Sequence, residues 1–218
     1  MLPKMKLYRI NINNLEDPLQ NERFLELAGP ERRKKVIRYH RPDDRKRSLG
    51  AGIIIKKILN ENGLSENDLK YGENGKPVVE KQKIYFNVSH AGDFVVGVLS
   101  DHEVGCDIEK AENAPLEIAE HYFTPGEYEY IKYASDKNKA FFTLWTLKES
   151  YMKMTGKGMS LPLDSFEIIR TADGFTLGKS SEKQCFFKTI EFEDYIFSVC
   201  NETDFILMQK GFTDIIKQ

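Results

Sequence analysis

The stretch Val104-Gly105-Cys106-Asp107-Ile108-Glu109 decides how we expect this chain to fold. It predicts a β-strand, because it combines β-branched and small residues with a glycine that permits close backbone approach. Side chains alternate between strand faces, so Asp107 and Glu109 point one way while Cys106 and Ile108 point the other way, into packing. The two carboxylates, roughly 7 Å apart along the backbone, repel each other unless a positive group lies between them. A hard cation such as Mg²⁺ would serve; for an isolated D-x-E motif, a solvated strand face is the commoner alternative.

Two apolar runs before this stretch predict further strands, at 84–90 and 94–100. With turns at 91–93 and 101–102, the centre of the chain is predicted to be a meander of three strands. Ser89 and His90 are adjacent on the first of them and therefore face opposite sides, which argues against a Ser–His catalytic dyad. A phosphate ligand or a structural hydrogen-bonding residue fits His90 better.

The segment 138–155 is the most informative predicted helix. One stripe at helical spacing is apolar, as a core-facing stripe should be, and comprises Leu144, Leu147, Tyr151 and Met154. A second stripe comprises Trp145, Lys148, Glu149, Met152 and Lys153. A core helix does not need these charges, so we expect Glu149 to deliver a third carboxylate to the metal, with lysines beside it to meet phosphate. The alternative for Glu149 is an i, i+4 ion pair with Lys153.

A basic segment lies at 31–47, with nine Lys or Arg against three Asp or Glu, a local charge of +6. The rest of the chain carries −8, so the positive charge is local and favours an anionic ligand. A solvated helix face is about as plausible for this segment alone, and the acidic remainder disfavours nucleic acid. Within it, Pro42 is predicted to end a helix, with Asp43 or Asp44 as the N-cap of the next one.

Composition places the chain among water-soluble globular proteins. Its 218 residues, 40% of them hydrophobic, allow one large domain or two small halves in close contact. No apolar run is long enough to cross a bilayer, so we expect no membrane contact. Three cysteines, an odd number and widely spaced, argue against a disulfide framework and a Cys₄ zinc site, and a reducing cytoplasm is the expected location.

The remaining segments carry little chemistry. Thr124-Pro125-Gly126-Glu127 predicts a capping box at a helix start, which gives Glu127 a structural role. From Leu161 onward the pattern predicts antiparallel strands with short turns, at 165–170, 175–178, 185–192, 195–200 and 205–210.

Three blocks of this sequence together resemble the signature of the 4′-phosphopantetheinyl transferases of the Sfp type. They are Phe86-Asn-Val-Ser-His90, the 104–109 stretch, and Trp145-Thr-Leu-Lys-Glu-Ser150 with Lys153 and Gly156-Lys-Gly158. The resemblance extends over most of the chain. Small departures, at Ala91, Cys106 and Met159, touch no charged position and leave the preferred carrier open.

The resemblance implies an α+β fold of two similar halves related by pseudo-two-fold symmetry, each with an antiparallel sheet packed on helices. The active site is expected between the halves, and we place their boundary near His102, giving 1–102 and 103–218. No repeat is visible in the sequence itself. The implied reaction transfers the 4′-phosphopantetheine group of coenzyme A to a serine of an acyl or peptidyl carrier protein and releases adenosine 3′,5′-bisphosphate; the implied enzyme is a monomer.

The resemblance also implies roles for residues. Mg²⁺ or Mn²⁺ is expected at Asp107, Glu109 and Glu149, bridging the pyrophosphate of coenzyme A. Glu149 is also the candidate general base, directly or through a water. Lys153 is expected to stabilise the departing α-phosphate and Lys148 to help fix the pyrophosphate.

The coenzyme A pocket is expected on the first half. The implied 3′-phosphate ligands are Arg32, Lys35 and His90, with Arg47 and Ser89 in the same nucleotide pocket and Lys76 near the adenine. Glu127 has two candidate roles, bracing the metal site or capping its helix. Leu116, Ile118, Tyr122 and Phe123 either form an apolar carrier-docking surface or pack in the core.

Two other function classes stay open at this point. A metal-dependent phosphodiesterase or nuclease would use the same carboxylates and would not need coenzyme A. A non-enzymatic binding module would use the basic segment to contact an acidic partner, and Glu149→Gln would leave its function intact.

Overall fold

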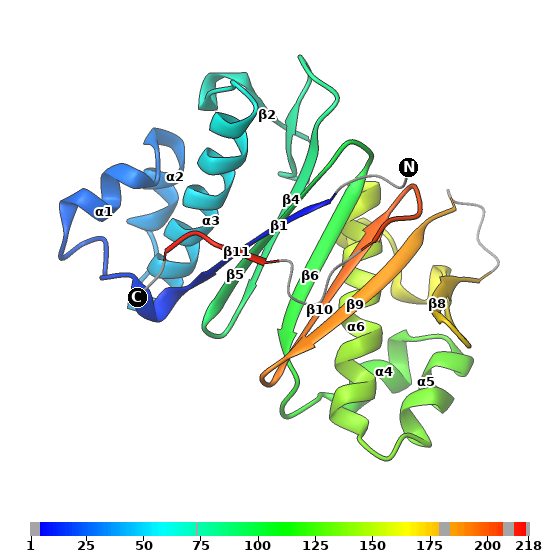
Figure 1. Ribbon diagram of the computed structural model, residues 1–218. Helices are drawn as coiled ribbons and strands as arrows, with labels where there is room; N and C mark the ends of the chain where they lie inside the picture. Colours follow the sequence, from blue (N-terminus) through cyan, green and yellow to red (C-terminus); the bar gives the residue numbers. More distant parts are fainter. Residues whose placement is uncertain (1–4, 73, 179–183, 207–211, 217–218) are drawn as a thin grey trace.

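Two main sheets lie side by side at the centre of the molecule, and each is covered by its own helices (Figure 1). The structure is a computed structural model that describes residues 5–72, 74–178, 184–206 and 212–216. This mixed architecture, with mainly antiparallel sheets packed on helices, confirms the α+β prediction. No helix in the described part of the chain combines the length and the apolar run that crossing a bilayer requires.

The first sheet has four strands: β1 (Lys6–Asn11), β4 (Tyr85–Ala91), β5 (Phe94–Ser100) and β11 (Phe212–Asp214). Their order is β11-β1-β5-β4, and every pair is antiparallel except β1 with β11. Helix α3 (Pro42–Glu61) packs on this sheet, and α1 (Glu22–Leu27) and α2 (Pro30–Val36) pack on α3. A small separate sheet pairs β2 (Leu69–Tyr71) with β3 (Pro77–Val79).

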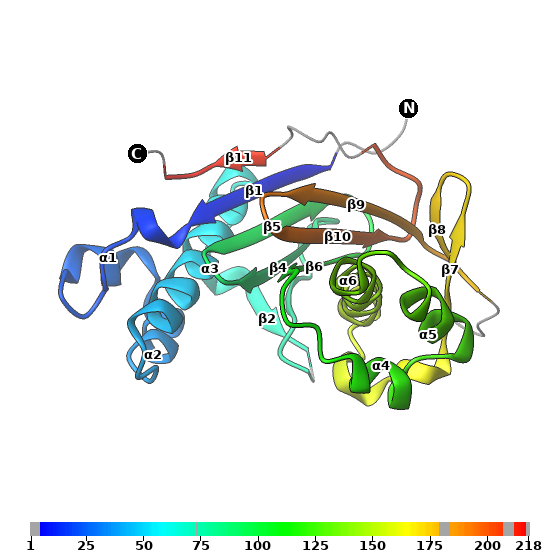
Figure 2. The same ribbon diagram turned by 90° about the horizontal axis from the view of Figure 1, so that it is seen from below.

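The second sheet has five strands: β6 (Val104–Lys110), β7 (Ile168–Thr171), β8 (Gly174–Leu177), β9 (Phe186–Phe192) and β10 (Tyr195–Asn201). Their order is β6-β10-β9-β8-β7, antiparallel throughout. Its helices are α4 (Leu116–Tyr122), α5 (Pro125–Lys132) and α6 (Lys137–Thr155). Figure 2 looks along α6, which lies against the sheet with α4 and α5 outside it. Short 3₁₀ turns occupy Ile12–Asn14, Glu66–Asp68, Gly158–Ser160 and Leu163–Ser165.

The predicted three-strand meander is wrong in its third member. β4 and β5 form a hairpin, but β6 pairs with β10, with Asp107 opposite Ser198. The alternating pattern of residues in β6 predicts which face of the strand is buried. The same pattern does not predict which strand pairs with it. β6 still lies beside β4, because Asn87 Oδ1 of β4 accepts a hydrogen bond from the Cys106 amide of β6 at 3.0 Å.

Two other predictions also need correction. Neither predicted aspartate is the N-cap of α3: Arg41 holds that position, and Pro42 begins the helix because proline suits its first turn. The strand predicted at 205–210 falls partly on residues 207–211, outside the described residues. Phe205 and Ile206 are not in a strand, and β11 was not predicted.

Three clusters of buried side chains stabilise this arrangement. One lies between the first sheet and its helices, and another between the second sheet and α4–α6. The third joins the two sheets, since it contains Val96 and Val98 of β5 together with Cys106 and Ile108 of β6. The predicted inward packing of Cys106 and Ile108 is thereby confirmed, and both side chains are fully buried.

Candidate active site at the seam between the sheets

Close packing of α6 on β6 places the acidic side chains of both elements together. Gly105 makes this possible, because any side chain there would clash with the backbone of α6 at Ser150 and Met154. The core stripe predicted for α6 is buried as expected, which turns Glu149 and Lys153 toward the β6 face that carries Asp107. The glycine therefore sets the distance between helix and strand on which the site depends.

A small polar network connects β4, β6 and α6. Lys153 Nζ donates to Asp107 Oδ1 at 2.6 Å and to Ser89 Oγ at 3.0 Å. The Ser89 hydroxyl in turn donates to Asp107 Oδ1 at 2.7 Å. Asp107 is only 3% exposed, and its second oxygen, Oδ2, is buried with no hydrogen-bond partner in the protein. One oxygen of this carboxylate is thus satisfied by the chain, and the other keeps an unused acceptor.

Glu109 and Glu149 belong to the same electrostatic cluster. Burial, followed by the negative charge of Asp107, raises the pKa of Glu109 to about 7, and the charge of Glu149 adds to the rise. Burial and Asp107 likewise raise the pKa of Glu149. Lys153 opposes both shifts. The three carboxylates therefore lie close enough to repel one another, which is what a cation between them would relieve.

The carboxylates of Asp107, Glu109 and Glu149 are the type of ligand that a hard divalent cation binds. Their side chains are nevertheless not arranged as a metal site in this structure. Among the described residues, no group of three His, Cys, Asp or Glu side chains is arranged to hold a metal ion. The ammonium of Lys153 is instead the cation bound to Asp107. Carboxylate oxygens are the ligands that Mg²⁺ and Mn²⁺ prefer, and Asp107 Oδ2 has an unused acceptor.

Lys148 does not face this cluster, contrary to its predicted contact with a pyrophosphate. Its ammonium is fully buried, 2.8 Å from Glu127 Oε1, and donates to the carbonyls of Leu163 and Phe166 at 2.7 and 2.9 Å. The Phe166 ring covers it, with the ring centroid 4.2 Å from Nζ. A ligand would have to break all of these contacts to reach the ammonium group, so we assign Lys148 a structural role.

Glu127 has the capping role that its position in the sequence predicts. One carboxylate oxygen accepts from the Thr124 amide at 3.0 Å, and the other accepts from the Ile168 amide at 2.7 Å. With Lys148, it ties α5 and α6 to the loop before β7. Glu127 is only 1% exposed, so the structure leaves it no room to brace a metal in the carboxylate cluster.

Two further candidates lie next to the cluster on the first half. Partial burial lowers the pKa of His90, and the positive charges of Lys153 and Arg47 lower it further. Arg47 is anchored, because it donates to the Gly92 carbonyl at 2.7 Å and to Asp44 Oδ1 at 2.6 Å. Cations thus gather beside the carboxylates, as an anionic ligand would require.

Arg32 and Lys35 lie on α2, on the side of the first half that carries the small sheet. Arg32 lines a cavity of about 90 Å³ between α2, α3 and β2, together with Gly52 and Tyr71. The ammonium of Lys35 lies 5.8 Å from the centroid of the exposed Tyr71 ring. The two cations thus share an aromatic neighbour, and within the described part of the chain no hydrogen bond or ion pair joins them to the carboxylate cluster.

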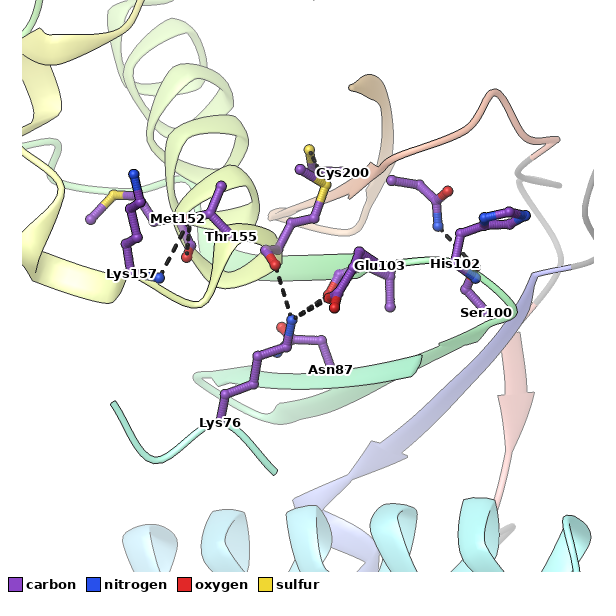
Figure 3. A network of polar contacts seen from close by, with 12 residues as sticks. Lys76, Asn87, Ser100, His102, Glu103, Met152, Thr155, Lys157 and Cys200 are labelled. Atoms are coloured by element: carbon purple, nitrogen blue, oxygen red, sulfur yellow. Dashed lines mark hydrogen bonds and ion pairs between the residues drawn. The ribbon is translucent and has the colours of Figure 1, made fainter. Parts of the chain in front are cut away.

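Lys76, predicted near an adenine, reaches the seam between the halves (Figure 3). Its ammonium donates to Glu103 Oε2 at 3.2 Å, to the Met154 carbonyl at 3.1 Å and to the Val104 carbonyl at 3.4 Å. Glu103 directly precedes β6, Val104 begins it, and Met154 lies at the end of α6. Lys76 therefore ties the turn between β2 and β3 to the second half.

The sequence reasoning missed Asn87, and it named Ser89 without predicting its contacts with Asp107 and Lys153. Asn87 bonds the backbone of β6, and Ser89 is a partner of Asp107 and Lys153. Both side chains are buried on β4, two residues apart. Their alternation along the strand was the available signal, since residues i and i+2 share a face and here share the face toward β6.

The predicted apolar docking face divides into core and surface. Phe123 is 6% exposed and stacks on Phe141 and Trp145, with ring centroids 5.8 and 6.3 Å apart. Tyr122 is 60% exposed. Core packing thus accounts for Phe123 and for one face of Trp145, while Tyr122 is available to a partner.

A larger cavity elsewhere does not compete with this site. It has a volume of about 1010 Å³ and lies between α5, the start of α6 and the β7–β8 hairpin. None of the candidate site residues lines it. Convergence of charged groups, rather than cavity size, therefore locates the candidate site.

Comparison with known proteins gives consistent matches over nearly the whole chain. Residues 103–200 match the family model described as the 4′-phosphopantetheinyl transferase superfamily, and residues 18–102 match the model described as 4′-phosphopantetheinyl transferase, N-terminal. The Sfp and ffp 4′-phosphopantetheinyl transferases of Bacillus subtilis are 34% and 33% identical to it, each match covering 90% of this chain and 92% of the relative. The gsp 4′-phosphopantetheinyl transferase of Aneurinibacillus migulanus is 36% identical over 80% of this chain and 76% of its own length.

Proposed function

The chain belongs to the 4′-phosphopantetheinyl transferase superfamily, and we propose that it transfers the 4′-phosphopantetheine group of coenzyme A to a serine of a carrier protein. The carrier is an apo acyl or peptidyl carrier protein, and the second product is adenosine 3′,5′-bisphosphate. The observation that carries the proposal is the convergence of Asp107, Glu109, Glu149 and Lys153 at the seam. Phosphoryl transfer requires such positioned charge more than covalent help from the protein.

A divalent cation, Mg²⁺ or Mn²⁺, is proposed at Asp107, Glu109 and Glu149. When bound, it supplies Lewis-acid stabilisation of charge on the phosphoryl group under attack. Support comes from the all-oxygen donor set, from the buried Asp107 Oδ2 without a hydrogen-bond partner, and from the charge of Asp107, which adds to burial in raising the pKa of both glutamates.

Glu149 is the proposed general base for the serine hydroxyl, directly or through a water. Its raised pKa supports this role, because a carboxylate in water is too weak a base to accept a proton efficiently near neutral pH. Lys153 lies beside it and is proposed to stabilise negative charge on the departing phosphate.

Coenzyme A is proposed to lie along the first half. Arg32, Lys35 and His90 are proposed to hold its 3′-phosphate, with Arg47 and Ser89 in the same pocket. The support is the +6 charge of residues 31–47 and the cations next to the carboxylate cluster. Lys76 near the adenine stays part of the proposal, although its ammonium has protein partners; Lys148 does not.

The proposed organisation is a cytoplasmic monomer of two halves, 1–102 and 103–218, with the carrier protein bound beside the metal. Exposed Tyr122 on the end of α4 is a candidate carrier contact. Neither nucleic acid nor a membrane has a proposed role.

The direct test is a mass measurement. An apo carrier protein is incubated with coenzyme A, Mg²⁺ and this protein, and the expected product carries one added phosphopantetheine. Parallel reactions use EDTA in place of Mg²⁺ and an inactive carrier whose acceptor serine is alanine; neither should gain mass. An unmodified carrier across acyl and peptidyl types, or cleavage of nucleic acid by the same preparation, would overturn the proposal.

A further inference from the structure

The carboxylate cluster already contains a cation, and the chain supplies it. Lys153 Nζ lies 2.6 Å from Asp107 Oδ1 and 3.0 Å from Ser89 Oγ, while the Ser89 hydroxyl donates to the same Asp107 oxygen at 2.7 Å. The donor directions are consistent: Ser89 gives its only proton to Asp107 and accepts one from Lys153. Ser89 thus fixes the ammonium and the carboxylate relative to each other.

The position of Lys153 is set by rigid parts of the fold. Its backbone belongs to the last turn of α6, which lies directly on β6 because Gly105 has no side chain. Ser89 belongs to β4, which is joined to β6 by the bond between Asn87 and the Cys106 amide. Only the Lys153 side chain, with four rotatable bonds, can move away from Asp107 without disturbing these elements.

An ammonium and a divalent cation would compete for the same oxygen. A cation that uses Asp107, Glu109 and Glu149 together would place two positive charges beside the ammonium, at a distance where like charges repel strongly. Leaving Lys153 on Asp107 would also block Oδ1 and leave only Oδ2 as a ligand.

We infer that Lys153 is an internal counter-ion of Asp107 that a divalent cation displaces, and that Ser89 is the positioning residue holding it there until then. The displaced ammonium becomes available to the negative charge of a phosphate ligand. Metal and phosphate binding are therefore coupled through one side chain: each makes the other more favourable. This rests on the proposed function for two identities: the divalent cation at Asp107, Glu109 and Glu149, and the phosphate ligand, which there is coenzyme A.

The test is a metal titration of the free protein, with neither coenzyme A nor carrier present. Electron paramagnetic resonance counts unbound Mn²⁺ for wild type, Lys153→Met and Lys137→Met. Lys137 is an exposed lysine at the other end of α6, so its variant removes the same charge from the same helix. Lys153→Met is expected to bind Mn²⁺ on the order of tenfold more tightly than wild type, given the coupling typical of close charge pairs. Lys137→Met should match wild type.

Equal or weaker Mn²⁺ binding by Lys153→Met, with Lys137→Met unchanged, would overturn the inference. Ser89→Ala provides a second arm, in which the ammonium loses its hydroxyl partner and Mn²⁺ affinity should rise by a smaller factor. Because no transfer reaction is measured, these results stand whether or not the protein modifies carriers.

A measurement on wild type covers the case in which Lys153→Met does not fold. Nitrogen-detected nuclear magnetic resonance of the lysine ammonium groups, assigned by Lys153→Arg, reports the environment of Nζ directly. Mg²⁺ is expected to shift the Lys153 signal from a hydrogen-bonded position to that of solvated lysines. A Lys153 signal that keeps its position at saturating Mg²⁺ would contradict displacement.

Discussion

Residues that are consecutive in the sequence have different roles here: some belong to the candidate site, and others stabilise the fold. Lys148 and Glu149 are neighbours on α6, yet Lys148 is enclosed with Glu127 while Glu149 lies with Asp107 and Glu109. One residue along a helix is a rotation of 100°, enough to move a side chain from the seam to the interior. The stripe that predicted a shared role for them was therefore too wide.

Glu149→Gln tests the base. We expect it to keep most affinity for coenzyme A, because the amide preserves size, and to lose roughly 10²–10⁴-fold in kcat if the carboxylate accepts the serine proton. Carrier modification rates and coenzyme A binding are measured on the same preparation. Near-normal turnover would reject this role.

The pKa of Glu109 predicts a pH dependence of stability. Since burial, followed by the charge of Asp107, raises its pKa from the ordinary value of 4.5 to about 7 on folding, the folded state binds this proton more tightly than the unfolded state. The resulting stability is fully present below about pH 4.5 and is lost as pH rises through about pH 7. In EDTA, wild type should lose about 2 kcal/mol over this window relative to Glu109→Gln, after allowing for partial solvent exposure. Urea unfolding at a series of pH values measures it; parallel profiles for both proteins would exclude the effect.

Two packing contacts position β6 and α6 at the site. Gly105 allows α6 to rest on β6, and the pair of Lys148 and Glu127 ties α6 to α5 and to the loop before β7. The sequence predicted that the backbone at Gly105 is closely approached, but it did not identify α6 as the neighbour. For the second contact, the sequence predicted only the capping box of α5, which the structure confirms.

Gly105→Ala should separate β6 from α6, because the added methyl group meets backbone rather than a flexible side chain. We expect a loss of about 2–3 kcal/mol or more in unfolding free energy, together with lost activity. Gly72→Ala is the control, since a methyl group there would make only ordinary contact, 3.8 Å from the Lys76 carbonyl oxygen. Similar unfolding midpoints for the two variants would show that the close approach is not essential.

Lys148→Met should act on stability rather than on ligand binding. It leaves the Glu127 carboxylate buried and unpaired, a change that typically costs about 3–5 kcal/mol. Adding Glu127→Gln should restore part of this loss, since the buried charge is then gone. A folded Lys148→Met protein with normal stability but weakened coenzyme A binding would return Lys148 to the ligand site.

The whole molecule depends on contacts that cross between the two sheets. A shared core joins β5 to β6, and β11 returns from the second half to pair with β1. Arg9 of β1 binds Asp214 of β11 and lies 5.2 Å from the ring centroids of both Phe192 and Phe212. The two halves therefore pack against each other as one unit. Residues of both halves fix the position of the candidate site between the sheets.

Lys76 provides a test at this scale. Lys76→Met removes three hydrogen bonds between the β2–β3 turn and the second half and should lower unfolding free energy by about 1–2 kcal/mol. Lys70→Met, which breaks an exposed pair with Glu80, should have a much smaller effect. Unchanged stability with a raised KM for coenzyme A would instead support a role at the adenine.

The sequence by itself determined most elements and the family. Strand and helix bounds followed closely from local alternation, helical spacing and turn residues, as for β4, β5 and α6, because these signals lie within a few residues of each other. The tertiary structure alone decided that β6 joins β10 instead of β5, that Lys148 is enclosed, and that Ser89 and Lys153 both bind Asp107. These outcomes depend on which of several equally apolar strands become neighbours and on a single helix rotation. Both are set by packing between segments distant in sequence, which no local pattern records.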